Sequence, residues 1–461
     1  MKPTLPTVQF NAQLLNKYDQ PLPRYTSYPP ATELKDTFDS HAYYKALADL
    51  NQRSSPLSLY FHIPFCQSAC YFCGCNVIVS NNKNIAQTYL DHLIQEVEQT
   101  TARVNTRKPV VQMHWGGGTP NYLTIAQVEQ LWATIEKHFE FDSKAEISIE
   151  INPRYVDRDY IQALRKIGFN RVSFGIQDFN PQVQEAVNRV QPRELLFNVM
   201  DWVRTADFDS VNVDLIYGLP YQTLETFSET IENTIALNPD RLAIFNFAYV
   251  PWLKPIQKKI PLDALPSGEE KLEILQMAIA RLTHSDYVYI GMDHFAKPND
   301  ELSIAQRNGE MKRNFQGYTT LPDAELLGFG LTSISMLHDA YYQHHKKLKD
   351  YYQAIENQEP PIEIGVRLHR EDILRREVIM QLMCHFELSK AEVEAQFHLD
   401  FDTFFATELA ELKRLETDNL VRIHDDRIEV TPSGRLLIRN VAAVFDEYLR
   451  DRIIANFSRA I

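Results

Sequence analysis

The sequence has little basic charge and lacks long apolar runs, and each shortage excludes a class of protein. Among its 461 residues, 47 are Lys or Arg and 61 are Asp or Glu, which gives a formal net charge of −14. A nucleic-acid-binding protein usually shows a basic surplus, so we expect no nucleic-acid partner. No apolar stretch approaches the roughly 20 residues that a membrane-spanning helix needs. The first residues lack the apolar core of a signal peptide, so we expect a cytoplasmic protein without a membrane span.

Cysteine is also scarce, but the few cysteines are unevenly distributed. The chain has five, and four of them fall within ten residues: Cys66, Cys70, Cys73 and Cys75. In a reducing compartment such a group indicates metal binding rather than disulfides. The fifth, Cys384, lies in an apolar stretch of helical period and is expected to belong to the core.

The first three cysteines have the spacing C-x3-C-x2-C. A cubane cluster of four irons usually takes four thiolates, so three protein ligands leave one iron open. An open iron can chelate the amino and carboxylate groups of S-adenosylmethionine, and electron transfer into the sulfonium releases a 5′-deoxyadenosyl radical. A structural zinc site made of all four cysteines is the alternative, and would fit a non-enzymatic zinc-binding interaction protein. Usual zinc spacings, however, place two short pairs farther apart.

Cys75 lies only two residues after Cys73 and is poorly placed to complete the same cubane. It is either a thiol close to the site, a proton or hydrogen donor, or a packing residue. The spacing alone does not choose among these three.

Short apolar runs of strand length alternate with segments of helical period from about residue 56 onward. The runs cover residues 57–62, 111–115, 146–151, 171–176, 211–217 and 242–249. Six strands, each followed by a helix, imply parallel pairing with right-handed crossovers. The sequence therefore predicts an α/β fold closed as a barrel or partial barrel, with a doubly wound open sheet as the alternative.

The two ends of the chain differ from this pattern. Residues 1–40 are rich in Pro and Tyr and are predicted to form an extended arm, because proline at this density resists helix and central strand alike. The catalytic domain is expected over residues 41–362. A small, mainly helical domain of possible winged-helix type is expected over 363–461. It would hold an amphipathic helix over 370–386, a helix opened by a capping box at Ser389, and a hairpin of residues 420–423 and 427–430.

Polar groups follow several of the predicted strands, and in parallel barrels functional groups gather where strands end. The second strand leads into Gly116-Gly117-Gly118-Thr119-Pro120, in a chain with only 15 glycines. Such a backbone can approach a ligand closely and present N–H groups to a carboxylate. Glu150 and Asp214 interrupt otherwise apolar strands. Each carboxylate suits a ribose hydroxyl or an ammonium group, and each could equally be a satisfied structural partner.

Several motifs together resemble one family, the oxygen-independent coproporphyrinogen III oxidases (dehydrogenases) of the radical S-adenosylmethionine superfamily. They are PRYTSYP at 23–29, YFHIPFC at 60–66, CGCN at 73–76, GGGTP at 116–120, GMDHFA at 291–296 and RNFQGY at 313–318. The resemblance spans nearly the whole chain, including the C-terminal domain.

The resemblance implies a partial parallel (β/α)6 barrel that holds a [4Fe-4S] cluster and two S-adenosylmethionine molecules. The cluster ligands would be Cys66, Cys70 and Cys73. The first cofactor molecule would contact Tyr60, Gly117, Glu150 and Ile334. The second would contact Phe72, Gly118, Thr119, Gln177, Arg189, Asp214 and Ala248. Positions associated with activity in the family match Tyr60, His62, Cys75, Phe315 and Gln316.

The implied reaction is the oxidative decarboxylation of two propionates of coproporphyrinogen III to vinyl groups, which gives protoporphyrinogen IX in haem biosynthesis. It needs a reductant and an electron acceptor that the sequence does not identify. A substrate with four carboxylates needs fixed cations, for which Arg24 and Arg313, together with Arg189, are candidates. A monomer is expected. The closest rival is a haem chaperone relative, against which Cys75, the arm and the Gln316 motif favour the oxidase. A haem-degrading radical methyltransferase relative is a further rival.

Overall fold

The computed structural model describes residues 8–321 and 324–450. Among the described residues, 34–274 and 324–367 form one compact unit, here the barrel unit, and 8–33, 275–321 and 368–450 form another, here the terminal unit. The sequence placed the boundaries at residues 40 and 362 instead. Residues 275–322 join the terminal unit because helix α12 (Arg370–His385) packs against β9 (Val288–Gly291) and β11 (Lys312–Asn314) within it.

The barrel unit is built on parallel strands that follow one another in chain order. Six of them are the predicted strands: β1 (Leu57–Ile63), β4 (Val110–Gly117), β5 (Phe141–Ile151), β6 (Arg171–Gln177), β7 (Ser210–Tyr217) and β8 (Arg241–Asn246). Each pairs in parallel with the next, as Leu59 does with Met113. The order does not reverse between β1 and β8, so the sheet winds in one direction, as in a barrel. The doubly wound alternative, which requires a reversal, is excluded.

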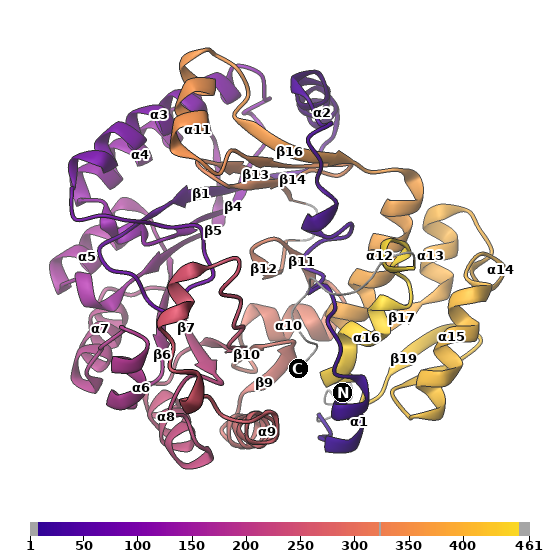
Figure 1. The fold of residues 1–461 in the computed structure, drawn as a ribbon. Helices are drawn as coiled ribbons and strands as arrows, with labels where there is room; N and C mark the ends of the chain where they lie inside the picture. The colour runs from indigo at the N-terminus through magenta and orange to yellow at the C-terminus, as the bar shows by residue number, and fades with distance from the viewer. Residues whose placement is uncertain (1–7, 322–323, 451–461) are drawn as a thin grey trace. The chain divides into compact units, whose positions relative to one another are not determined.

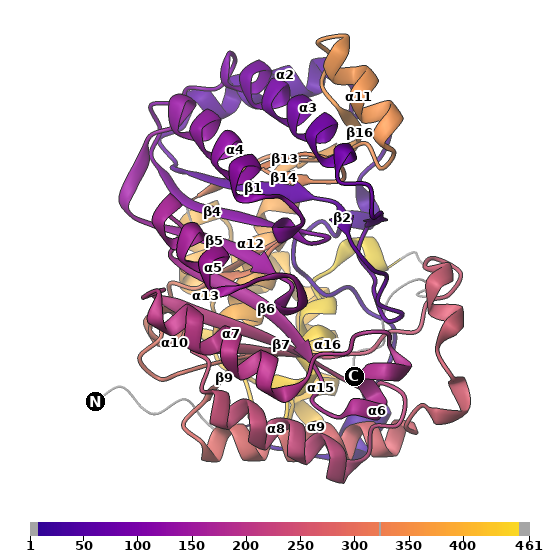
Figure 2. The ribbon, with the colours of Figure 1, turned by 90° about the vertical axis from the view of Figure 1, so that its left-hand side faces the viewer.

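Helices connect successive strands and lie along the outer side of the sheet (Figures 1 and 2). They are α3 (Asn84–Thr101), α4 (Ile125–His138), α5 (Arg158–Ile167), α6 (Pro181–Ala186), α7 (Arg193–Thr205) and α8 (Leu224–Leu237), with α2 (Ser40–Gln52) before β1. The predicted apolar face of α4 is confirmed, because Val128, Leu131 and Ile135 are fully buried. Thr124 caps this helix by accepting a hydrogen bond from the Gln127 N–H. Among the helices of the described residues, none is long and apolar enough to cross a membrane.

Four unpredicted strands of the barrel unit extend the main sheet beyond β1. Strand β13 (Glu325–Phe329) pairs in parallel with β1 on the side opposite β4. Strands β14 (Ile334–Met336), β15 (Ala340–His344) and β16 (Ile362–Arg367) follow it in antiparallel order, and α11 (Leu348–Glu356) lies between the last two in sequence. These strands are only 3 to 6 residues long, too short to show a clear alternation of apolar and polar positions.

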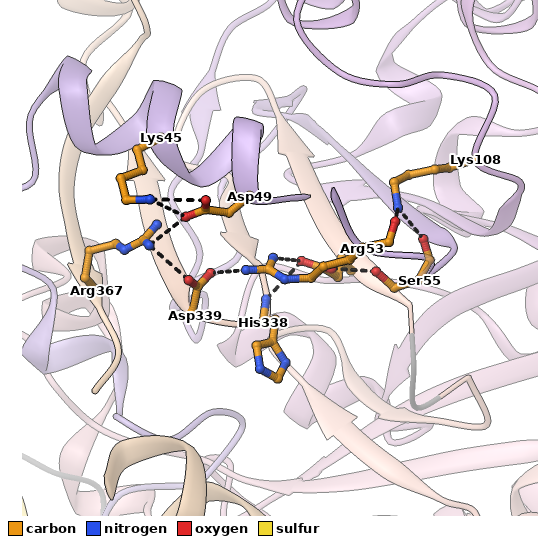
Figure 3. Close-up of polar contacts among 9 residues, drawn as sticks. Lys45, Asp49, Arg53, Ser55, Lys108, His338, Asp339 and Arg367 are labelled. Carbon is orange, nitrogen blue, oxygen red and sulfur yellow. Dashed lines mark hydrogen bonds and ion pairs between the residues drawn. The ribbon is translucent and has the colours of Figure 1, made fainter. Parts of the chain in front are cut away.

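An ion-pair network lies at the amino ends of β1 and β13 (Figure 3). The guanidinium of Arg53 contacts Glu325 at 3.0 Å and Asp339 at 2.6 Å. Arg367 contacts Asp339 at 2.9 Å and Asp49 at 2.8 Å. The network therefore ties α2 to the sheet at the end opposite the cysteine loop, which follows the carboxyl end of β1.

The terminal unit combines small sheets with mostly short helices. Besides β9, β11 and α12, its elements are α1 (Ala12–Tyr18), β10 (His294–Ala296), α10 (Glu301–Asn308), β12 (Gly317–Thr319), β17 (Glu387–Ser389), α13 (Lys390–Phe397), α14 (Phe401–Phe404), α15 (Ala406–Thr417), β18 (Val421–Ile423), β19 (Arg427–Val430) and α16 (Ile438–Ala443). Helix α9 (Gly268–His284) carries the chain into this unit from the barrel unit. The predicted hairpin is present as β18 and β19, and Ser389 caps α13.

Two predictions for this unit need correction. The arm is not extended throughout, because α1 forms after Asn11, whose side chain accepts a hydrogen bond from the Leu14 N–H at 3.1 Å. Helix α12 is not amphipathic over its second half, where residues 378–384 are all buried. Its neighbours include the sequence-distant segments β9, α10 and β11, in addition to β17, which follows it directly. Cys384 is fully buried there, as predicted.

Candidate functional site

A cavity of about 620 Å³ lies in the barrel unit, where the carboxyl ends of the parallel strands meet the cysteine loop. The predicted site residues that line it are Cys66, Phe72, Cys70, Cys73, Cys75, Gly117, Gly118, Thr119, Glu150, Gln177, Arg189 and Asp214. They come from six separate segments of the chain, and the strand order of the sheet brings them together. The position of the cavity is the one at which parallel barrels place their functional groups.

The cysteine loop begins on β2 (Phe65–Cys66) and returns on β3 (Ile78–Val79), which pair in parallel. Two guanidinium groups approach Cys70: Arg154 Nη2 and Arg189 Nη1 each lie 3.7 Å from its Sγ atom. These contacts place two cationic donors beside the sulfur atom, where their charge would complement a metal-bound thiolate.

The other thiols respond to different neighbours. A hydrogen bond from Cys75 lowers the pKa of Cys73 to about 6, and the same contact raises the pKa of Cys75. Burial raises the pKa of Cys66 to about 11, although Thr119 Oγ1, at 3.3 Å, acts in the opposite direction. A bound metal would deprotonate Cys66 outright, because a coordinating thiol loses its proton to the charge of the ion.

Among the described residues, no group of three His, Cys, Asp or Glu side chains lies close enough to hold one metal ion. The ligands of a cubane each bind a different iron and need not converge on one point. The cationic donors beside Cys70 supply the environment that a thiolate ligand needs. On this observation the three-cysteine loop fits an iron–sulfur cluster.

The triple glycine is required by close packing as well as by its place in the cavity wall. Gly117 has a φ of +115°, and a Cβ atom there would lie 2.7 Å from the His62 ring. A Cβ atom at Gly118 would lie 2.7 Å from the backbone of Pro64. The Gly117 N–H points to Glu150 Oε2 at 3.3 Å. From the sequence, we expected these glycines to let a ligand approach the backbone closely. The structure shows that they also let this segment pack closely against β1.

A carboxylate pair lies at the ends of β5 and β7. His114 Nε2 is 3.2 Å from Glu150 Oε1, and its Nδ1 is 2.5 Å from Ser148 Oγ. Burial, and then the charge of Glu150, raises the pKa of Asp214 to about 7, against a hydrogen bond from Asn212 at 2.9 Å. Asp214 is therefore poised to change charge near neutral pH.

Two residues of the cavity wall carry buried polar atoms that find no hydrogen-bond partner in the described part of the chain. They are Gln177, through Oε1, and Arg189, through Nε. Gln177 also has a φ of +69°, a backbone conformation that side chains other than glycine adopt rarely. Buried polar atoms are nearly always paired, so these two favour a polar ligand in the cavity.

Four predicted residues of the barrel unit do not line the cavity. Tyr60 and His62 lie on β1 beside Gly117, with Tyr60 Oη 3.0 Å from His62 Nδ1. Ile334 is the first residue of β14. Ala248 is exposed and follows β8, which ends at Asn246 rather than at residue 249 as predicted.

The remaining predicted residues belong to the terminal unit. Arg24 forms an ion pair with Asp293. Arg313 is buried, stacks on the Tyr318 ring at 4.5 Å, and has two N–H groups, Nε and Nη1, without a partner among the described residues. Gln316 likewise has an unpartnered buried Nε2, and Phe315 precedes it. The free donors of Arg313 fit an anionic ligand better than the already paired Arg24.

Sequence reasoning missed three residues of the site. Arg154 approaches Cys70, His114 contacts Glu150, and Lys254 lines the cavity, where its Nζ donates to Cys75 O at 2.9 Å. His114 interrupts a run of strand character, which is a signal that could have been used. Arg154 and Lys254 lie in connections without a motif of their own, so only the folded chain reveals them.

Comparison with known proteins extends these observations. Residues 60–233 match the model of the radical SAM superfamily, and residues 368–437 match that of the HemN C-terminal domain. The oxygen-independent coproporphyrinogen III oxidase of Synechocystis sp. is 59% identical over 466 residues, which cover 100% of both chains. The protein of the same name from Escherichia coli is 48% identical over 455 residues, covering 98% of this chain and 99% of the other.

A solved structure has the same fold as this chain. It is described as coproporphyrinogen III oxidase (HemN) from Escherichia coli, a radical SAM enzyme. It is similar to this chain with a TM-score of 0.92 and 46% sequence identity, and the match covers 96% of this chain and 100% of that one.

Proposed function

Because the chain belongs to the oxygen-independent coproporphyrinogen III oxidase family, we propose that it converts two propionates of coproporphyrinogen III into vinyl groups in haem biosynthesis. The product is protoporphyrinogen IX. The observation that carries the proposal is the 59% identity to an oxidase of that name over the full length of both chains. The cysteine loop in the wall of the cavity supports it, because a cluster held there would lie beside space for S-adenosylmethionine.

The cysteine loop fits a [4Fe-4S] cluster whose ligands are Cys66, Cys70 and Cys73. When bound, the cluster and S-adenosylmethionine supply a radical that removes a hydrogen atom from the substrate. Arg154 and Arg189, each 3.7 Å from Cys70 Sγ, would stabilise this sulfur as a cluster ligand. Their charge also offsets the negative charge that thiolate ligands bring into a partly buried site.

Two S-adenosylmethionine molecules would occupy the cavity and its surroundings. The first would contact Tyr60, Gly117, Glu150 and Ile334, and the second Phe72, Gly118, Thr119, Gln177, Arg189, Asp214 and Ala248. The unpaired Oε1 of Gln177 and Nε of Arg189 offer an acceptor and a donor to the second molecule. Ionised Glu150 accepts hydrogen bonds only, so it suits an ammonium group or ribose hydroxyls.

The substrate brings four carboxylates, and Arg313 is the better of the two candidate anchors in the terminal unit. Its unpartnered N–H groups can form a fork with one propionate, and Gln316 offers a further donor beside it. The proposed site residues also include Arg24, Phe315, His62 and Cys75.

For each propionate, a hydrogen atom leaves the carbon β to the carboxyl group, carbon dioxide is lost, and one electron passes to an acceptor. The reductant and that acceptor are further partners, and we propose a cytoplasmic monomer.

The test is anaerobic reconstitution of the protein, followed by addition of reductant, S-adenosylmethionine and coproporphyrinogen III. Mass spectrometry should show two successive losses of carbon dioxide plus two hydrogens from the porphyrinogen. Omission of S-adenosylmethionine is the control. Unchanged substrate, with the cluster intact and the cofactor cleaved, would refute the oxidase and favour a haem-handling relative.

A further inference from the structure

The turn between β13 and β14, residues 330–333, has an unusual backbone. Thr332 has a φ of +62°, a value at which a β-branched side chain is strained. Its N–H donates to His345 O at 3.0 Å, and its carbonyl accepts from Gln343 Nε2 at 3.1 Å. A strained backbone conformation persists only where several surrounding contacts hold it in place, and such residues often occur at functional sites.

This turn packs directly against His62. The Thr332 hydroxyl lies 3.5 Å from His62 Nε2, and a Cβ atom at Gly330 would lie 2.8 Å from His62 O. Tyr89 joins the two segments, because its hydroxyl donates to His62 O at 2.6 Å and accepts from the Leu331 N–H at 2.9 Å. Both the ring and the backbone of His62 are therefore held by the turn.

The contacts of His62 fix which ring nitrogen carries its proton. Nε2 lies 3.4 Å from the carbonyl oxygen of Asn76, which can only accept, so the proton is on Nε2. Nδ1 is then the acceptor for the Tyr60 hydroxyl at 3.0 Å. Burial lowers the pKa of His62 to about 4, so the ring is neutral at neutral pH. The Thr332 hydroxyl oxygen is a second acceptor for the same Nε2–H.

Glu96 on α3 fastens the other end of the turn. Its carboxyl group is buried, and Oε2 accepts from the Gly330 N–H at 2.9 Å and from the Tyr351 hydroxyl at 2.5 Å. Its Oε1 lies 3.3 Å from His344 Nδ1. Burying a carboxyl group costs free energy unless it is hydrogen-bonded. The contacts of Glu96 offset that cost and hold the turn in place.

We infer that Thr332 and Glu96 are positioning residues for the Tyr60–His62 pair, Thr332 by holding the His62 ring through the contact of its hydroxyl with Nε2 and Glu96 by anchoring the turn that carries Thr332. Neither residue lines the cavity. The inference rests on the proposed function, in which Tyr60 contacts the first S-adenosylmethionine. The position of the His62 ring directs the Tyr60 hydroxyl, which donates to Nδ1, and the direction of that hydroxyl determines the contact.

The test compares Thr332→Val, which keeps the shape and loses the hydroxyl, with Thr332→Ser, which keeps the hydroxyl. Thr234→Val is the matched control, because Thr234 is a buried threonine of α8 whose hydroxyl donates to Thr230 O within the same helix. Calorimetry on the anaerobically reconstituted protein measures the affinity for S-adenosylmethionine. We expect Thr332→Val to weaken binding about 2- to 10-fold, while Thr332→Ser and Thr234→Val bind as the wild type does.

A double-mutant cycle distinguishes positioning from a general structural role. In a His62→Phe background, Thr332→Val should cause no further loss of affinity, because its partner is gone. Equal losses in both backgrounds, or no loss in either, would overturn the inference. Glu96→Gln, which keeps an acceptor for the Gly330 N–H, should bind more tightly than Glu96→Leu. A wild-type protein with an intact cluster that fails to bind S-adenosylmethionine would instead refute the proposed function.

Discussion

Arg189 reaches the thiol of Cys70, with 3.7 Å between its Nη1 and the Sγ atom. Its Nη2 donates to the carbonyl oxygen of Gly175 at 2.9 Å, which fixes the guanidinium in that direction. Because Arg189 is buried, little water screens its charge from the thiol. The residue thus joins the candidate cluster loop to the end of β6.

Removing this contact should weaken retention of the cluster. Arg189→Leu removes one of the two guanidinium groups that contact Cys70 in the described part of the chain, so we expect less iron and sulfide per chain after anaerobic reconstitution and desalting. Arg193→Leu is the control, since Arg193 contacts Asn233 and Phe197 away from the loop. Equal iron contents in the two variants would show that Arg189 does not support the cluster.

The cysteines should separate into two classes by metal content. We expect Cys66→Ser, Cys70→Ser and Cys73→Ser each to lose iron and labile sulfide, because each removes one of three thiolate ligands. Cys75→Ser should retain both, and so should Cys384→Ser, which alters a thiol buried in the terminal unit. Iron and sulfide analysis measures this directly. Zinc in place of iron, lost equally in Cys75→Ser, would support the four-cysteine zinc site.

Gly117→Ala should disturb the end of β1. A side chain at a φ of +115° is strained, and the new Cβ atom would lie 2.7 Å from the His62 ring. We expect a loss of at least about 1–2 kcal/mol in unfolding free energy, seen as a lower urea midpoint, and weaker S-adenosylmethionine binding. Gly268→Ala is the control, because no atom lies within 4 Å of its added Cβ. Equal urea midpoints and equal affinities for S-adenosylmethionine in the two variants would contradict the requirement for glycine at position 117.

The network of Figure 3 should affect stability without affecting the site. Arg53→Met leaves the nearly buried Glu325 without its guanidinium partner, at a cost of about 2–3 kcal/mol. S-adenosylmethionine binding should not change, because the network lies at the amino ends of the strands. Lys45→Met, which removes an exposed ion pair with Asp49, should cost at most about 0.5 kcal/mol. Urea unfolding measures the change in stability, and calorimetry measures the affinity for S-adenosylmethionine. A loss of binding in Arg53→Met would show that the network also affects the site.

The sequence predicted the parts of the molecule that depend on local spacing. The six parallel strands and the apolar face of α4 follow from periodicity. The ends of those strands then locate Glu150, Gln177 and Asp214 at one cavity without any coordinates.

The parts that depend on distant partners could not be predicted in the same way. Strand β13 is recognised as a strand only through its pairing with β1. Lys254 and Arg154 belong to the site because the fold brings their loops to the cysteines. Helix α12 gave a misleading pattern, since its buried second half is covered by segments far away in sequence.

Glu96 provides a prediction for the pH dependence of stability. Burial raises the pKa of Glu96 to about 8, well above the usual value for a glutamate. Between the unfolded and folded pKa values the folded chain binds more protons than the unfolded chain, so this group's contribution to stability falls as pH rises and is lost above pH 8. The slope is at most about 1.4 kcal/mol per pH unit.

Glu96→Gln carries no titrating group at this position and should lack that contribution. The urea midpoint of the wild type should therefore fall, relative to the variant, as the pH rises from 6.5 to 8. The lowered pKa of His344, about 4, keeps that neighbour from titrating in this window. Glu98→Gln alters an exposed glutamate on the same helix and should follow the wild type. Parallel pH profiles for the wild type and Glu96→Gln would show that Glu96 is already ionised in the folded chain at neutral pH, and that its hydrogen bonds from Gly330 and Tyr351 outweigh burial.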